Sequence, residues 1–309
     1  METPSLKAAP DFSCDYHRRM TCSTTVACRW LGAAALLGVL LLLGPMARAQ
    51  PADPTSVWLD GGGRPNASAI DALHLLADAP ADALVAEDYQ AGALASQAAA
   101  LQRTAPADGP QAQAFARLLD ASMQRFVRDL HSGRIDPRSL GFRIKARGGA
   151  TMDFGAVLHD AAARQQLPQA VLALRPTLAQ YGLLRKALAR YRAMASRASF
   201  GPLPTIAPAR SLQPGAAYVG AAELQRRLIM LGDQPADAPA PQNQYSMALA
   251  DAVKHFQARH GLDADGVLGP ATLAALDVPL DQRVRQIALA LERLRWLPDL
   301  GKQRFIGIN

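Results

Sequence analysis

The sequence predicts a mainly α-helical protein with two helical domains. Apolar residues recur at helical spacing through much of the 309-residue chain, and glycine or proline stands where these stretches end or begin. Runs of Ala, Leu and charged residues outnumber runs of β-branched residues, which favours helices over strands. Because 50% of the residues are hydrophobic, the chain can build two compact cores.

The first 49 residues have the order of a secretory signal peptide. Arg29 precedes an apolar run at 31–43, and a small-x-small pattern ends at Ala49. Cleavage after Ala49 leaves Gln50 as the first residue of the exported chain. The apolar run is shorter than the roughly 20 residues that span a bilayer, so we expect no retained membrane anchor.

The signal region lies unusually far from Met1. We expect Met20 to be the true start, because it gives a conventional short basic leader. All three cysteines lie within or before the leader, at Cys14, Cys22 and Cys28. The exported chain should therefore contain no disulfide and no cysteine nucleophile, and the periplasm is its expected location.

A lead-in rich in Pro, Asp, Gly and Ser at 50–69 should be exposed. The first helical domain follows at 70–205. Its longest amphipathic helix, of about four turns, ends at Gly133 and carries an apolar stripe at Phe115, Leu119, Met123, Phe126 and Leu130. A second such helix has its apolar face at Tyr181, Leu184, Leu188 and Tyr191, with basic residues mostly on the solvated side.

A smaller domain at 206–278 reads as three short helices around one apolar centre. The first has Leu224, Leu228 and Leu231 at i, i+4, i+7 and stops at Gly232. The second stops at Gly261 and has its apolar face at Leu249, Val253, Phe256 and His260. Asp265 and Gly266 turn the chain, and Pro270 opens a third helix that carries Leu273 and Leu276.

The remaining segment, 279–309, is expected to hold a linker helix and the start of a further domain. Residues 283–294 form a helix with Val284, Ile287, Leu291 and Leu294 inward. Residues 305–309 have the composition of a β-strand.

The three-helix pattern resembles the peptidoglycan-binding-domain-1 family. The residues that carry this resemblance are Leu224, Gln225, Leu228 and Gly232, then Val253, Phe256, Gln257, His260 to Leu262, Asp265 to Gly269, Thr272 and Leu276. The first domain is similar to the helical scaffold domain of large murein L,D-transpeptidases. That similarity is carried by Leu118 to Asp120, Asp129 to Pro137, Tyr181 to Arg185 and Ala187 to Arg192.

The L,D-transpeptidase resemblance also implies what should follow these domains. The family places a mainly-β catalytic domain after the binding module, with a His and a Ser-x-Gly-Cys-x-Arg motif, and the segment at 292–298 resembles its lead-in. No such motif occurs in this chain. We therefore expect the N-terminal part of a murein L,D-transpeptidase, cut before its catalytic domain and inactive alone. The alternative is a stand-alone, non-catalytic peptidoglycan-binding protein.

Other catalytic sets have little support in the sequence. His74 and His159 lie singly on helical segments with acidic neighbours, where a packed or surface role is more common than a catalytic one. The formal charge is +7, of which about +5 remains after the leader, a balance that suits an anionic polymer. A nucleic-acid partner would rest on this charge alone, and the export signal argues against it.

Four polar residues near the end of the second helix are candidates for peptidoglycan binding: Gln257, Arg259, His260 and Asp265. Charged and amide groups suit a polymer of sugars and carboxylates. The same residues could instead solubilise the surface or cap helices. Asp263 and Asp265 resemble a fragment of a calcium loop, but the remaining ligands are missing, so we expect no metal and no cofactor. The oligomeric state is left open.

Overall fold

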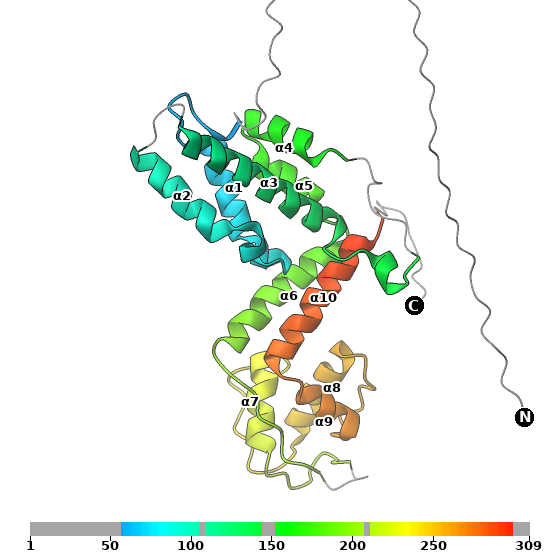
Figure 1. Cartoon of the computed structure of the whole chain (residues 1–309). Coiled ribbons are helices and arrows are strands. Elements are labelled where there is room, and N and C mark those ends of the chain that lie inside the picture. The colour runs from blue at the N-terminus through cyan, green and yellow to red at the C-terminus, as the bar shows by residue number, and fades with distance from the viewer. Residues whose placement is uncertain (1–56, 105–108, 144–151, 207–210, 299–309) are drawn as a thin grey trace, which may run out of the picture. The chain divides into compact units, whose positions relative to one another are not determined.

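The computed structural model describes residues 57–104, 109–143, 152–206 and 211–298 (Figure 1). These ranges contain ten α-helices and three short 3₁₀ helices, and within them no β-strand forms beyond isolated bridges. The predicted mainly helical fold is confirmed. The segment at 50–69, expected to be an exposed lead-in, is not exposed throughout its described part: Trp58 is buried in the first core, because its large ring removes apolar area from water. The leader, the cleavage site at Ala49 and Gln50, and the predicted strand at 305–309 lie outside the described residues.

Five helices and two 3₁₀ helices enclose the first core. They are α1 (Ala67–Ala77), η2 (Ala79–Asp82), η3 (Ala86–Tyr89), α2 (Ala91–Thr104), α3 (Pro110–Ser132), α4 (Phe154–Ala163) and α5 (Leu167–Leu174). All five residues of the predicted α3 stripe are buried in this core. With 23 residues, α3 is longer than the predicted four turns, because it begins at Pro110, before the stripe starts at Phe115, and continues past Leu130 to Ser132.

Helix α2 was not predicted from the sequence. Its inward side chains are Ala91, Leu94, Ala98 and Leu101, all of them buried. This stripe is at helical spacing, but half of it is alanine in a segment that is rich in alanine throughout, so the apolar face contrasts little with the rest of the helix.

The second core belongs to the small domain and confirms its three predicted helices, α7 (Ala221–Leu231), α8 (Met247–Arg259) and α9 (Pro270–Leu276). Gly232 ends α7 in the left-handed conformation, with φ of 83°. Ser246 caps α8 by accepting a hydrogen bond from the backbone N–H of Leu249. A short 3₁₀ helix elsewhere, η4 (Pro137–Leu140), follows α3.

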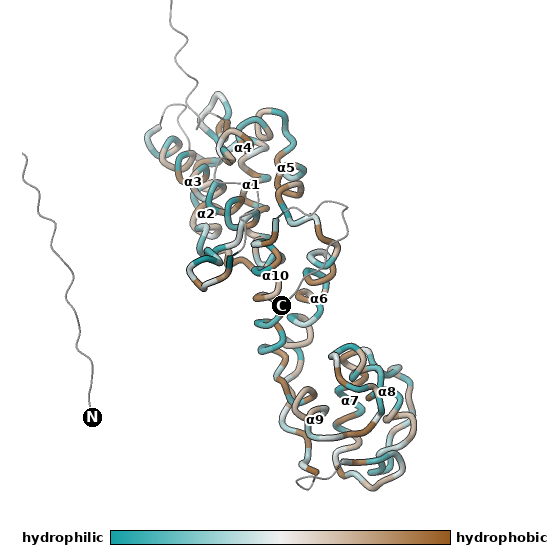
Figure 2. Tube along the Cα trace, turned by 90° about the vertical axis from the view of Figure 1, so that its right-hand side faces the viewer, coloured by the Kyte–Doolittle hydropathy of each residue, from teal (hydrophilic) through white to brown (hydrophobic). Residues whose placement is uncertain are grey.

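Helices α6 (Ala179–Ala195) and α10 (Leu280–Trp296) lie side by side and antiparallel (Figures 1 and 2). Between them they bury Leu188 and Leu291. One end of the pair, through Tyr191 and Leu280, joins the core of the three-helix domain. The predicted linker helix is thus present, and it begins three residues earlier and ends two residues later than expected.

The other end of the pair contains buried polar groups. The Asp82 carboxylate accepts hydrogen bonds from the Tyr181 hydroxyl at 3.0 Å and from Arg175 at 2.9 Å. Arg185 forms an ion pair with the same carboxylate at 2.8 Å. Arg295 of α10, which is 1% exposed, donates to the backbone carbonyl of Asp82 and to the Tyr181 hydroxyl. Burial raises the pKa of Tyr181 to about 12, so its hydroxyl stays protonated at neutral pH and can donate.

Glu292 connects α10 to the turn that follows α3. Its carboxylate accepts from the backbone N–H groups of Arg134 and Ile135 at 2.6 and 3.0 Å, and it pairs with Arg295 at 2.8 Å. Gly133 has φ of 86°, and a Cβ there would lie 2.7 Å from Oε1 of Glu292. Glycine is therefore required both by the backbone conformation and by the approach of α10.

We predict that Glu292→Ala lowers the free energy of unfolding by about 3 kcal/mol, because it leaves Arg295 buried without its counter-ion and two backbone donors without an acceptor. Glu292→Gln should cost less, since its amide oxygen still accepts from the two N–H groups. Urea unfolding of residues 50–309, followed by circular dichroism, measures both.

The matched control is Arg293→Ala, one position along the same helix on an exposed side chain. It should change stability by less than about 0.5 kcal/mol. A loss below about 1 kcal/mol for Glu292→Ala would contradict the role assigned to this carboxylate.

Candidate functional site

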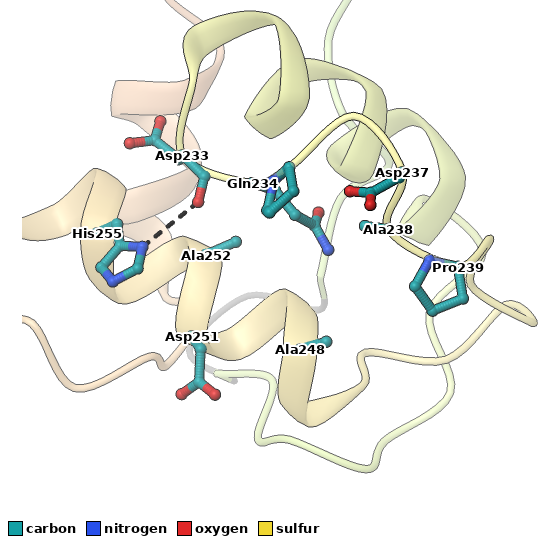
Figure 3. Close-up of a pocket in the computed structure, with 10 residues that line it drawn as sticks. Asp233, Gln234, Asp237, Ala238, Pro239, Ala248, Asp251, Ala252 and His255 are labelled. Carbon is teal, nitrogen blue, oxygen red and sulfur yellow. Dashed lines mark hydrogen bonds between the residues drawn. The ribbon is translucent and has the colours of Figure 1, made fainter.

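A hollow of about 400 Å³ opens on the three-helix domain between α8 and the segment that follows α7 (Figure 3). Most of its lining is polar or small. The lining residues are Asp233, Gln234, Pro235, Asp237, Ala238, Pro239, Ala248, Asp251, Ala252 and His255.

Local sequence explains why the 233–239 segment lies there. The left-handed Gly232 reverses the chain at the end of α7, and the Asp233 backbone N–H then donates to the carbonyl of Leu228 at 2.8 Å. The far end of the segment is held by Gln225 of α7, whose amide donates to the Pro239 carbonyl at 2.8 Å. Gln225 is itself buried, so this bond fixes one wall of the hollow.

Asp233 forms a structural ion pair with Arg259. Its side chain is 1% exposed and accepts two hydrogen bonds from Arg259, at 2.7 and 2.5 Å. The hydrogen bond to Asp233 raises the pKa of Arg259 above its usual value. This bidentate pair joins α8 to the segment after α7. The backbone carbonyl of Asp233 also lies 3.4 Å from Nδ1 of His255.

Gln257, a predicted binding residue, lies under the turn that follows α8. It is 2% exposed, and its amide donates to Asp265 at 2.9 Å, to the Val267 carbonyl at 3.1 Å and to Thr272 at 3.1 Å. Its oxygen accepts from the backbone N–H of Gly266 at 2.8 Å. Gln257 therefore holds the turn in place from below.

Asp265 also serves this turn. Its carboxylate accepts from the backbone N–H of Val267 at 2.8 Å and from Gln257. The Val267 N–H, followed by Gln257, holds the pKa of Asp265 below its usual value. Gly266 adopts φ of 72°, and a Cβ there would lie 3.1 Å from the Ala250 carbonyl, so the turn requires glycine.

His260 stacks on Phe256, with ring centroids 3.9 Å apart, and its Nδ1 lies 2.8 Å from the Phe256 carbonyl. Burial lowers the pKa of His260. None of the four predicted residues lines the hollow, and only Arg259 is linked to it directly, through Asp233. Their role as ligands of the wall polymer stays a prediction.

Sequence reasoning did not select Gln234, Asp237 or His255. A signal was present, because 233–239 is a polar, proline-interrupted segment directly after a helix-ending glycine, where loops and ligand-binding residues concentrate. His255 stood in the second helix, but helical spacing gave no reason to prefer it.

Outside this domain, His159 contacts Asp120 at 2.6 Å, and the same carboxylate accepts from Trp58 at 3.1 Å. This is a packed histidine that joins α4 to α3. In the part of the chain that the structure describes, no group of three or more His, Cys, Asp or Glu side chains could hold a metal ion. No described helix is long and apolar enough to cross a membrane.

Comparison with known families gives two matches along the chain. Residues 50–188 match the family described as "Scaffold domain", and residues 220–276 match the one described as "Putative peptidoglycan binding domain". A search of curated proteins gave no match. The second match covers α7, α8 and α9 and contains the hollow, and it supports peptidoglycan binding as the role of this domain.

We predict that Gln257→Leu lowers the free energy of unfolding by about 1–3 kcal/mol, because the buried N–H of Gly266 loses its acceptor and the Thr272 hydroxyl loses one of its two hydrogen bonds. Gln282→Leu, an exposed glutamine in the first turn of α10, is the matched control and should have little effect. Thermal unfolding of both variants measures the difference. Unchanged stability of Gln257→Leu would contradict the structural role assigned to this residue and would favour a binding role.

Proposed function

We propose that this chain is an exported peptidoglycan-binding protein that forms the N-terminal part of a murein L,D-transpeptidase. The observation that carries the proposal is the order of the two family matches, a scaffold domain followed by a peptidoglycan-binding domain. This order fits the N-terminal architecture of those enzymes. The signal-like leader at 1–49 supports export to the periplasm.

The geometry supports different roles for the two domains: the three-helix domain binds the polymer, and the scaffold domain holds the end of α10. The three-helix domain offers a hollow of about 400 Å³, lined by a few polar side chains and by small apolar ones, a size suited to a sugar or a few residues of a stem peptide. The scaffold domain packs the end of α10 against itself, with Trp296 and Glu292 against Gly133. A catalytic domain that followed α10 would begin beside the scaffold.

In this proposal the present chain binds and positions the wall polymer, and the transfer of the stem-peptide acyl group belongs to a domain that follows. That transfer needs a nucleophile such as a cysteine thiolate. The three cysteines of this chain precede the expected cleavage site.

The second candidate is a stand-alone wall-binding protein, which the same binding domain would equally support. The coding sequence after codon 309 separates the two. We expect an open frame that encodes a His and a Ser-x-Gly-Cys-x-Arg motif. A stop codon at that point, in the gene of the source organism, would favour the stand-alone binder.

Peptidoglycan binding itself is tested by co-sedimentation of purified residues 50–309 with isolated sacculi across a salt series. We expect saturable binding that survives moderate salt, because uncharged and buried contacts are screened less than surface charge. Soluble muropeptides should compete. Binding that disappears with salt would be explained by net positive charge alone and would contradict a specific site.

A further inference from the structure

The hollow on the three-helix domain contains a polar side chain with an oxygen that no described residue hydrogen-bonds. Gln234 is 8% exposed, and its Oε1 is buried with no hydrogen-bond donor among the described residues. Figure 3 shows its amide pointing into the space between α8 and the 237–239 segment. A buried acceptor without a donor costs free energy, so a ligand that supplies a donor here would recover it.

Of the three aspartates that line the hollow with Gln234, two form ion pairs with basic side chains. Asp233 is paired with Arg259, and Asp251 is paired with Lys254 at 3.0 Å. Asp237 lies at the rim of the hollow, exposed, and no described residue pairs with it. The uncompensated charge beside the free acceptor of Gln234 is therefore negative.

The rest of the lining is small and apolar. Ala248 and Ala252 of α8 face Ala238 and Pro239 across the hollow, while His255 lies at one end near Asp233 (Figure 3). Such walls suit a short aliphatic chain. A ligand that fits all three features carries a positively charged N–H donor at the end of an aliphatic chain.

We propose that this hollow binds the free side-chain ammonium of the diamino acid in the peptidoglycan stem peptide. The proposal rests on the proposed function and specifies which part of the polymer is recognised. An ammonium donates to Oε1 of Gln234 and pairs with Asp237, whereas a carboxylate of the stem peptide would be repelled there. The N-acetyl group of a sugar could satisfy Gln234 but would leave Asp237 unused.

The first test is isothermal titration of residues 50–309 with a soluble stem tripeptide that ends in a diamino acid. Two forms of the probe are compared, one with a free side-chain amine and one with that amine acetylated. We expect binding of the free form and a loss of at least about tenfold in affinity on acetylation, as for removal of a charge-assisted hydrogen bond. Equal binding of the two forms would overturn the proposal.

A lysine-containing tripeptide distinguishes two sources of the same ammonium. Its side chain ends in the amine alone, whereas diaminopimelate adds a carboxylate beside it. Binding of either peptide supports ammonium recognition. Binding of a chitin oligosaccharide at this site, with neither peptide bound, would overturn it.

Variants then assign the contacts. Gln234→Leu and Asp237→Asn should each weaken binding of the free tripeptide, by about tenfold for Gln234→Leu. Asp263→Asn removes an exposed carboxylate of the same domain outside the hollow and should leave binding unchanged. Gln234→Leu should also leave the melting temperature equal or raise it, because the buried oxygen has no partner to lose in the described part of the chain.

The outcomes separate this proposal from the proposed function. Sacculus binding that persists in Gln234→Leu, with no tripeptide bound by the unaltered protein, would overturn the ammonium site and retain peptidoglycan binding. Tripeptide binding without sacculus binding would retain the site and contradict the proposed function. A fall in melting temperature for Gln234→Leu comparable to that of Gln257→Leu would show a structural amide and overturn the site.

Discussion

The fold depends on charges that are buried where α10 meets the first helical domain. Arg295 is almost inaccessible, and an arginine in that position is tolerated only because Glu292, Tyr181 and the backbone of Asp82 supply its acceptors. Asp82, equally buried, is in turn balanced by Arg175 and Arg185. These groups come from segments more than 200 positions apart in the chain. The network is directional, so it fixes the register of α10 in a way that its apolar stripe alone does not.

A consequence is that the two helical domains are not separate bodies joined by a loose linker. Helix α6 starts in the polar network at Tyr181 and ends in the core of the three-helix domain at Tyr191 and Met194. Helix α10 returns along it from Leu280 to Arg295. The core that continues between them, around Leu188 and Leu291, connects the binding domain to the scaffold through packed side chains.

Sequence patterns predicted the helices whose apolar stripes are strong and whose ends carry glycine or proline, such as α3 with Gly133 and α7 with Gly232. They missed α2, whose stripe is half alanine. They predicted α10 as a helix without its partner, because periodicity shows which face is apolar and contains no information on what packs there. The role of Gln257 was within reach, since it follows Val253 by four positions and so shares the buried face of α8. The hollow could not be predicted from the sequence, because it depends on the path that the loop takes after Gly232.

Gln257 and Gln234, two of the buried glutamines of the small domain, differ in how their amides are used. Gln257 and Gln234 are buried to a similar extent, but Gln257 uses both ends of its amide on the turn at 265–272, whereas the oxygen of Gln234 meets no donor from the described protein. A buried amide oxygen without a hydrogen-bond donor lowers the free energy of unfolding. A leucine at position 234 would avoid this loss. A glutamine at this position, beside an aspartate that pairs with no described residue, is explained by the external ligand that we propose. In the function we propose, the segment after α7 contacts the ligand, whereas the turn after α8 supports the fold.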